Sequence, residues 1–103
     1  MEKTYFTLTG TSHYFGTDFL EKDMIVELEK EPENEFDKEA ILVRAEGLGK
    51  IGYVANSPFT VQGESISAGR MYDRIGDKAT GIVVYVLSNG VLCKLSEENA
   101  KGE

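Results

Sequence analysis

The sequence predicts a single, mainly β domain in which about six strands close, or partly close, into a small barrel. Several short segments alternate apolar and polar side chains, which predicts the strands. One longer segment, residues 66–75, has apolar residues at helical spacing, which predicts little helix beside them. A chain of 103 residues can bury one modest core. Closure is the economical arrangement because it removes exposed strand edges. The alternation alone does not distinguish a barrel from a two-sheet sandwich.

The first two strands are predicted at residues 5–11 and 24–30. In the first, Phe6 and Leu8 face one side and Thr7 faces the other, among β-branched and aromatic residues that favour strands. The second alternates apolar residues with carboxylates, which continue into the next turn as an acidic stripe: Glu27, Glu29, Glu31, Glu33 and Glu35. We expect a solvated face here rather than a metal site, because these carboxylates follow an extended chain and do not converge.

Residues 31–54 carry turn chemistry that we expect to shape the centre of the domain. Pro32 pushes the residue before it into an extended conformation. Asn34 and Asp37 have short polar side chains that accept hydrogen bonds from nearby backbone N–H groups, which favours a shaped loop. Phe36 is a large apolar group within this polar turn, so it needs either a pocket in the core or a ligand.

The remaining strands are predicted at residues 40–43, 50–54, 80–87 and 91–95. Gly52, inside one of them, marks a bulge or a close backbone approach. The continuous apolar character of residues 80–87 predicts burial on both faces. An Asn-Gly pair between the last two segments predicts a hairpin.

One or two short helices are expected between the fourth and fifth strands. Ser57-Pro58 resembles an N-cap followed by proline at the first helical position. The better helix covers residues 66–75, where Arg70 and Arg74 would share a face. They either face solvent, pair with the acidic stripe or contact phosphate. We expect one domain over residues 1–96, followed by a polar tail over residues 97–103.

Composition and charge exclude several classes of protein. The net charge is −7, and residues 21–46 hold ten acidic and four basic side chains, which argues against general coating of DNA. A single cysteine, Cys93, cannot form an internal disulfide, so we expect a cytoplasmic protein. No apolar run is long enough for a membrane span and no signal peptide is visible. With one histidine, no catalytic triad motif and no phosphate-binding glycine loop, we expect no enzyme activity, metal or cofactor.

The central segment resembles the HIRAN domain family. The resemblance rests on the spacing P-x-N-x-[F/Y]-D-x-x-A-[I/V]-x-V followed by [I/V]-G, which is fairly specific. It is carried here by Pro32, Asn34, Phe36-Asp37, Ala40-Ile41, Val43 and Ile51-Gly52-Tyr53. Gly10 and Tyr14-Phe15-Gly16 also fit the opening segment of the family. The likeness spans roughly residues 5–95 and is thin over residues 56–78. It implies a stand-alone, bacterial-type member with an OB-like barrel that binds single-stranded DNA at a free 3′ end.

The resemblance also implies roles for individual residues. Phe36 would stack on the terminal base, and Asp37 would accept a hydrogen bond from the 3′-hydroxyl while repelling a terminal phosphate. His13 or Tyr14 would form a second aromatic wall, and Tyr53 would line the same pocket. The other candidate contacts are Asn34, Lys50, Gly52, Arg70 and Arg74. Structural roles remain open beside these: a loop bond for Asp37, core packing for Phe36, and packing on the barrel for Tyr53.

The chain departs from the DNA-binding members of the family at three positions. Ser12 stands where they have an arginine, Phe36 lacks the hydroxyl of a common tyrosine, and Ala55-Asn56 replaces lysines. Each change removes a polar or cationic contact. The leading hypothesis is recognition of a DNA 3′ end in DNA repair or at stalled replication forks, beside a helicase, nuclease or other partner. The alternative is a protein-interaction module whose acidic strand meets a basic partner.

Overall fold

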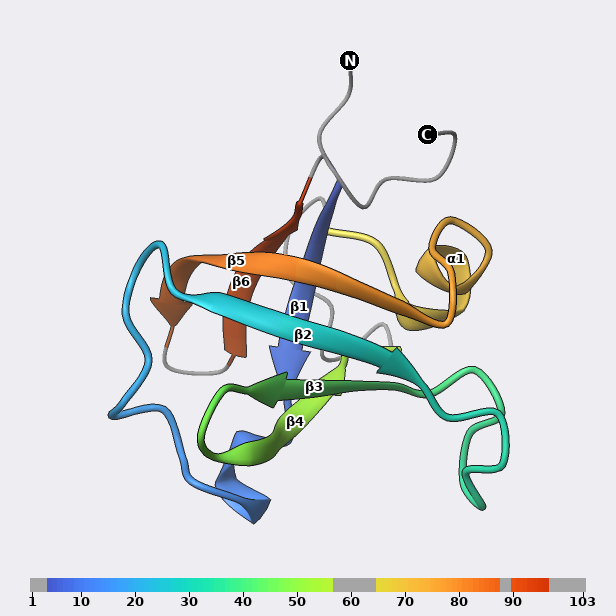
Figure 1. Cartoon of the computed structure of the whole chain (residues 1–103), viewed down its shortest axis with the longest axis horizontal. Helices are drawn as coiled ribbons and strands as arrows, with labels where there is room; N and C mark the ends of the chain where they lie inside the picture. Colours follow the sequence, from blue (N-terminus) through green and yellow to red (C-terminus); the bar gives the residue numbers. More distant parts are fainter. Residues whose placement is uncertain (1–3, 57–64, 88–89, 97–103) are drawn as a thin grey trace.

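The structure, a computed structural model, describes residues 4–56, 65–87 and 90–96. Within these ranges, six antiparallel strands form a closed barrel in the order β1-β4-β3-β2-β5-β6 (Figure 1). The strands are β1 (Tyr5–Thr9), β2 (Ile25–Lys30), β3 (Ile41–Ala45), β4 (Gly49–Val54), β5 (Lys78–Leu87) and β6 (Gly90–Leu95). Two short helices accompany them, the 3₁₀ helix η1 (Thr11–His13) and α1 (Ala68–Tyr72). The prediction of a mainly β, six-stranded barrel is confirmed.

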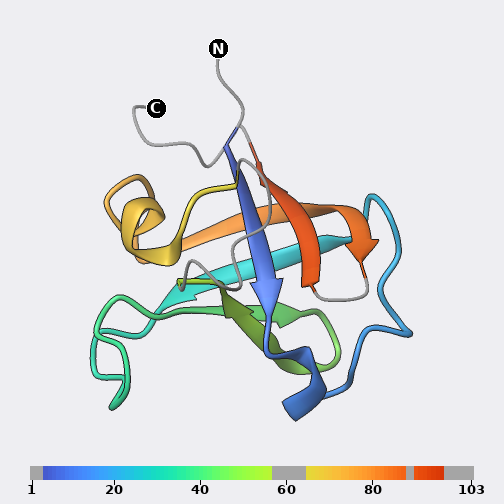
Figure 2. The ribbon, with the colours of Figure 1, turned by 180° about the vertical axis from the view of Figure 1, so that it is seen from behind.

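The barrel is built from strands that cross at a steep angle. In Figure 1, β2 and β5 run side by side across the front, and in the reverse view of Figure 2, β1 and β6 cross in front of them. The β3–β4 hairpin completes the wall beside β2, and α1 lies at the end where β2 stops and β5 begins. This arrangement leaves the loop between β2 and β3 projecting from the barrel at the same end.

Alternate residues of the strands fill the interior, as the period of two requires. The ring of Phe6 crosses to β5, where a Cβ on Gly81 would lie 2.8 Å from its Cζ atom, so the glycine makes room for the ring. Fully buried strand side chains in the core cluster include Phe6, Leu8, Val26, Ile41, Val43, Ile51, Val83, Val91 and Cys93. Burial also raises the pKa of the Cys93 thiol to about 12, so this cysteine behaves as a core residue.

Thr7 lies on the face of β1 opposite Phe6 and Leu8, as predicted, and this outer face is covered at Thr7 by another segment. Its side chain is fully buried, and its Oγ1 lies 2.8 Å from Ser65 Oγ. Just beyond, Ile66 N donates to Tyr5 O at 2.8 Å and forms a parallel bridge with Phe6. The segment that leads into α1 therefore packs against the outside of β1, a contact across more than fifty residues that strand alternation cannot reveal.

The expectation that β5 is buried on both faces was wrong. From Ala79 to Val84 its residues alternate between buried and half-buried, and the last three residues are exposed, with Tyr85 at 60%. β2 begins at Ile25, opposite Ile82, so β5 continues past the end of its neighbour. A bulge between Val83 and Tyr85 then changes the facing of the final residues.

The predicted helix at residues 66–75 forms over a shorter range. Ser67 caps α1, its Oγ accepting from Arg70 N at 3.4 Å, and the helix ends when Arg74 N donates to Met71 O at 2.8 Å, an i→i+3 turn. Arg74 therefore lies beyond the helix and does not share a helical face with Arg70. The short helix predicted to begin at Ser57-Pro58, residues 88–89 of the hairpin turn and the polar tail lie outside the described residues.

Gly52 allows β4 to approach β1. A Cβ at this position would lie 2.6 Å from Thr9 O and 2.6 Å from Leu8 Cδ1, closer than side chains tolerate. The sequence-based prediction of a close backbone approach or a bulge applies to this strand in both senses, because one extra residue, Ile51, separates the β3–β4 pairs Val43–Gly52 and Arg44–Lys50.

Gly52→Ala should therefore lower the free energy of unfolding by about 1–3 kcal/mol, since the added methyl group must displace a backbone carbonyl. Gly76→Ala is the matched control: it is exposed, and a Cβ there would meet no atom within 4 Å. We expect the control to stay within about 0.5 kcal/mol of the parent protein in urea denaturation. Equal stability of the two variants would show that β1 and β4 can separate without cost.

Candidate functional site

The loop between β2 and β3 is held in shape by the side chain of Asn34. Its Oδ1 accepts hydrogen bonds from Phe36 N at 2.8 Å and from Asp37 N at 3.0 Å, and its Nδ2 donates to Glu31 Oε1 at 3.1 Å. The loop base is closed where Glu31 N donates to Ala40 O at 2.9 Å. These bonds occupy the backbone on both sides of the aromatic residue, and the Phe36 side chain is left 94% exposed. An aromatic ring this exposed on a hydrogen-bonded loop has no packing role in the described chain.

The carboxylate of Asp37 is bound from two sides. Oδ1 accepts from Glu39 N at 2.9 Å within the loop, and Oδ2 accepts from Asn56 Nδ2 at 2.7 Å, at the end of β4. Asn56 Oδ1 in turn accepts from Gly69 N at 2.8 Å, in the first turn of α1. One amide side chain thus joins the loop to the helix through the carboxylate. This arrangement sets the plane of the Asp37 carboxyl group.

Tyr53 and Lys50 lie on the same side of β4 because of the bulge at Ile51. Residues three apart on a regular strand face opposite sides, and the extra residue restores a common facing. Lys50 Nζ donates to Tyr53 Oη at 3.2 Å, and Tyr53 Oη donates to Glu31 Oε1 at 2.7 Å. The ammonium also lies 5.7 Å from the ring centroid of Tyr14 and 5.3 Å from that of Tyr53, within the range of cation–π attraction.

The side chains of Lys50, Tyr53 and Glu31, joined by hydrogen bonds, stabilise one another's charge states. Burial alone would raise the pKa of Glu31, but the hydrogen bonds that Tyr53 and Asn34 donate, with the nearby cations, lower it below its ordinary 4.5. The hydrogen bond to Tyr53 raises the pKa of Lys50. Burial, and then the bond to Glu31, raise the pKa of the Tyr53 phenol. At neutral pH, Glu31 is therefore a carboxylate, Tyr53 a neutral phenol and Lys50 an ammonium group.

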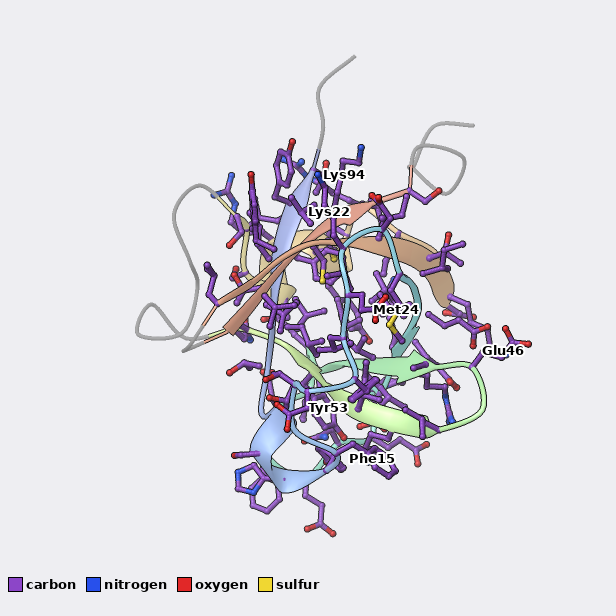
Figure 3. The ribbon with its side chains drawn as sticks, turned by 90° about the vertical axis from the view of Figure 1, so that its left-hand side faces the viewer. Phe15, Lys22, Met24, Glu46, Tyr53 and Lys94 are labelled. Atoms are coloured by element: carbon purple, nitrogen blue, oxygen red, sulfur yellow. The ribbon has the colours of Figure 1, made fainter. Side chains whose placement is uncertain are left out.

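These groups surround one open cleft of about 550 Å³, a size within the usual range for small-ligand sites. Its walls combine three aromatic rings, one carboxylate, two amides and two aliphatic side chains: Tyr14, Asn34, Phe36, Asp37, Ala40, Tyr53, Val54 and Asn56. In the view of Figure 3, Tyr53 lies toward the η1 end of the barrel, while Glu46 projects from the β3–β4 turn. The aromatic faces can stack on a planar group, and the carboxylate can accept a hydrogen bond from it.

A family model for the HIRAN domain matches residues 1–98 of the chain. The chain belongs to the HIRAN domain family. The crystal structure of the HIRAN domain of human HLTF is similar, with a TM-score of 0.60 and 18% sequence identity over 94% of this chain and 78% of that one. At this identity the likeness shows the fold, and it agrees with the predicted OB-like barrel. No curated protein matches the chain.

The structure brings half of the predicted site residues of this HIRAN domain to the cleft. Five line it: Tyr14, Asn34, Phe36, Asp37 and Tyr53. Lys50 contacts two of its rings. Of the two candidates for the second aromatic wall, Tyr14 takes that place, while His13 is exposed on η1 and does not line the cleft.

Three predicted contacts lie away from the cleft. Gly52 faces β1, so the approach that it permits is to another strand and not to a ligand. Arg70 and Arg74 are exposed near α1 and do not line the cleft. Neither arginine therefore adds positive charge to the lining of the cleft.

Sequence reasoning missed the structural part played by Asn56 and Glu31. The sequence marks Asn56 only as a departure from lysine, yet this residue binds the Asp37 carboxylate across nineteen residues. The sequence places Glu31 in the acidic stripe, but its carboxylate is the acceptor for Tyr53. The signal available in the sequence was the polar spacing around Asn34, which does not show which distant donors would reach these carboxylates.

The described part of the chain holds no candidate metal site and no candidate membrane-spanning helix. No three His, Cys, Asp or Glu side chains there converge as a metal ion would require. Neither helix within those ranges has the length and apolar character that a membrane span needs.

Removing the Tyr53 hydroxyl tests the hydrogen-bonded chain of this HIRAN domain. Tyr53→Phe should lower the free energy of unfolding by about 1 kcal/mol at neutral pH. Because the folded pKa of Glu31 is lowered, its contribution is complete above 4.5 and is lost as the pH falls through the folded value. The deficit of the variant should therefore shrink in acid.

Urea denaturation across this pH range provides the measurement. Tyr85→Phe is the matched control, since Tyr85 is 60% exposed on β5, and its stability should follow that of the parent protein at every pH. If Tyr53→Phe lost the same unfolding free energy at every pH, the contribution of the Tyr53 hydroxyl would not depend on the ionisation of Glu31.

Proposed function

We propose that this HIRAN domain binds the 3′-hydroxyl end of single-stranded DNA in the cleft beside the β2–β3 loop. The family is known to bind DNA. The observation that carries the proposal is the placement of the Phe36 ring, 94% exposed, next to the Asp37 carboxylate at one cleft with two tyrosines. Stacking between a base and an aromatic ring contributes about 1–3 kcal/mol and does not depend on sequence.

The hydroxyl end is selected by charge. The Asp37 carboxylate accepts a hydrogen bond from a free 3′-hydroxyl and repels a 3′-phosphate. Lys50, beside Tyr14 and Tyr53, supplies a cation for an internal phosphate of the bound strand. One or two such contacts suit a protein with a net charge of −7, because end recognition does not require a long basic track.

This binding would serve DNA repair or the processing of stalled forks, in which free 3′ ends arise. The domain acts by binding and has no catalytic step of its own in this proposal. A helicase or nuclease partner would then act on the strand that the domain holds, in the cytoplasm. The domain itself covers residues 1–96, with residues 97–103 as a polar tail.

Fluorescence anisotropy with short 5′-labelled oligonucleotides tests the proposal. A strand with a 3′-hydroxyl should bind about tenfold more tightly than the same strand with a 3′-phosphate. Asp37→Asn should reduce the ratio of the two affinities, and Phe36→Ala should weaken binding of both strands about tenfold. Glu46→Gln makes the same charge change as Asp37→Asn at an exposed turn residue and should leave the ratio unchanged. Equal binding of the two ends by the parent protein would refute recognition of the hydroxyl.

The acidic stripe supports a second candidate function, an adaptor that binds a basic protein partner. On the outer face of the barrel, Glu27 lies opposite Arg44, and Glu29 lies opposite Lys78 and forms an ion pair with Arg44 at 3.2 Å. A second depression of about 520 Å³ lies over these residues. The carboxylates that continue into the β2–β3 loop would extend this surface for a cationic segment.

The two candidates predict different competition. A lysine- and arginine-rich peptide should not displace a bound 3′-hydroxyl strand if the cleft is the DNA site and the stripe is a separate surface. Glu27→Gln should weaken binding of the peptide and leave binding of the oligonucleotide unchanged. Failure of any basic peptide to bind the parent protein at low salt would remove the adaptor function.

A further inference from the structure

The Asp37 carboxylate lines the cleft and retains acceptor capacity on both oxygens. A carboxylate has about four lone-pair sites. Each oxygen accepts one hydrogen bond from the described chain, Oδ1 from Glu39 N at 2.9 Å and Oδ2 from Asn56 Nδ2 at 2.7 Å. One site on each oxygen therefore remains, and the residue lines the cleft.

Asn56 holds these two acceptors in one orientation. Its amide cannot turn over without losing a bond, because Oδ1 accepts from Gly69 N at 2.8 Å while Nδ2 donates to Asp37. The backbone donor at Glu39 fixes the other oxygen. The carboxyl group is therefore prevented from rotating by donors from two separate segments, and both oxygens are presented together.

Two adjacent acceptors match two adjacent hydroxyl donors. A 2′-deoxy terminal sugar offers one hydroxyl and satisfies one oxygen, whereas a terminal ribose offers the 2′- and 3′-hydroxyls of a cis-diol. A carboxylate likewise accepts a hydrogen bond from a ribose 2′-hydroxyl in dinucleotide-binding folds. The neutral amide of Asn56 also keeps the negative charge of Asp37 unpaired, whereas a lysine in its place would neutralise it and attract phosphate.

We propose that the ligand this cleft binds most tightly is a single strand whose 3′-terminal sugar carries a free 2′,3′-cis-diol, with Asn56 as the residue that positions Asp37. The inference rests on the proposed function, because it requires a 3′ end in the cleft. Two sources share this chemistry: an RNA 3′ end, and a DNA strand that ends in a single ribonucleotide.

Four 5′-labelled strands of one sequence separate the possibilities by anisotropy: all-DNA, DNA with one 3′-terminal ribonucleotide, the same strand with a terminal 2′-O-methyl group, and all-RNA. The terminal ribonucleotide should improve binding about fivefold over all-DNA, as expected for one further hydrogen bond to a charged acceptor at a partly exposed site. The 2′-O-methyl strand should return to the all-DNA affinity, because it cannot donate. If the all-RNA strand binds as tightly as the strand with one terminal ribonucleotide, RNA 3′ ends are a source of the ligand. If the all-RNA strand binds more weakly, the ligand is a DNA strand that ends in one ribonucleotide.

The failure of this inference differs from the failure of the proposed function. If the deoxy and ribo ends bind equally while a 3′-phosphate still weakens binding, the cis-diol is overturned and recognition of the hydroxyl end stands. If a 3′-phosphate binds as well as every hydroxyl end, both are overturned.

Asn56→Ala tests the positioning role. The variant should lose most of the fivefold preference for the terminal ribonucleotide, since the carboxyl group can then rotate, while stacking on Phe36 maintains binding of the all-DNA strand. An unchanged preference would exclude Asn56 as the positioning residue. If the variant does not fold, the comparison of the four strands with the parent protein still decides the inference about the ligand.

Discussion

The candidate site depends on the side chain of Asn34, which accepts hydrogen bonds from two backbone N–H groups. Its Oδ1 binds the N–H groups of Phe36 and Asp37 at 2.8 and 3.0 Å, which fixes the backbone at both residues. The ring is consequently exposed to solvent, and the carboxylate turns toward β4 and Asn56. Without this turn, an apolar ring in a polar loop would be free to fold back onto the barrel.

The barrel supplies the rigid side of the cleft. The bulge at Ile51 brings Lys50 and Tyr53 to one face, and the chain from Lys50 through Tyr53 to Glu31 links β4 to the base of the loop. Loop and barrel are thus joined twice, through Tyr53 on one side of the cleft and through Asn56 on the other. Rigid elements that hold a site from two directions reduce the entropy lost when a ligand binds.

Local patterns predicted what local physics determines. Alternating segments and short apolar runs located all six strands of the described chain, and the turn chemistry around Asn34 located the loop that lines the cleft. The missed features arise from contacts between distant segments. Burial of Thr7 depends on Ser65, and Asn56 reaches Asp37 across the site. The exposed end of β5 depends on where β2 begins, which no pattern within β5 encodes. Arg70 and Arg74 could not be placed because the end of α1 decides their facing.

The central claim is that the ring and carboxylate held by Asn34 contact the terminal nucleotide. Titration of the ¹⁵N-labelled protein with a short 3′-hydroxyl strand, followed by heteronuclear NMR, tests it most directly. The account predicts that the largest shifts occur at the backbone amides of Phe36 and Asp37 and at the side-chain amide of Asn56. Shifts confined to β2 and its acidic stripe, with these amides unmoved, would contradict it.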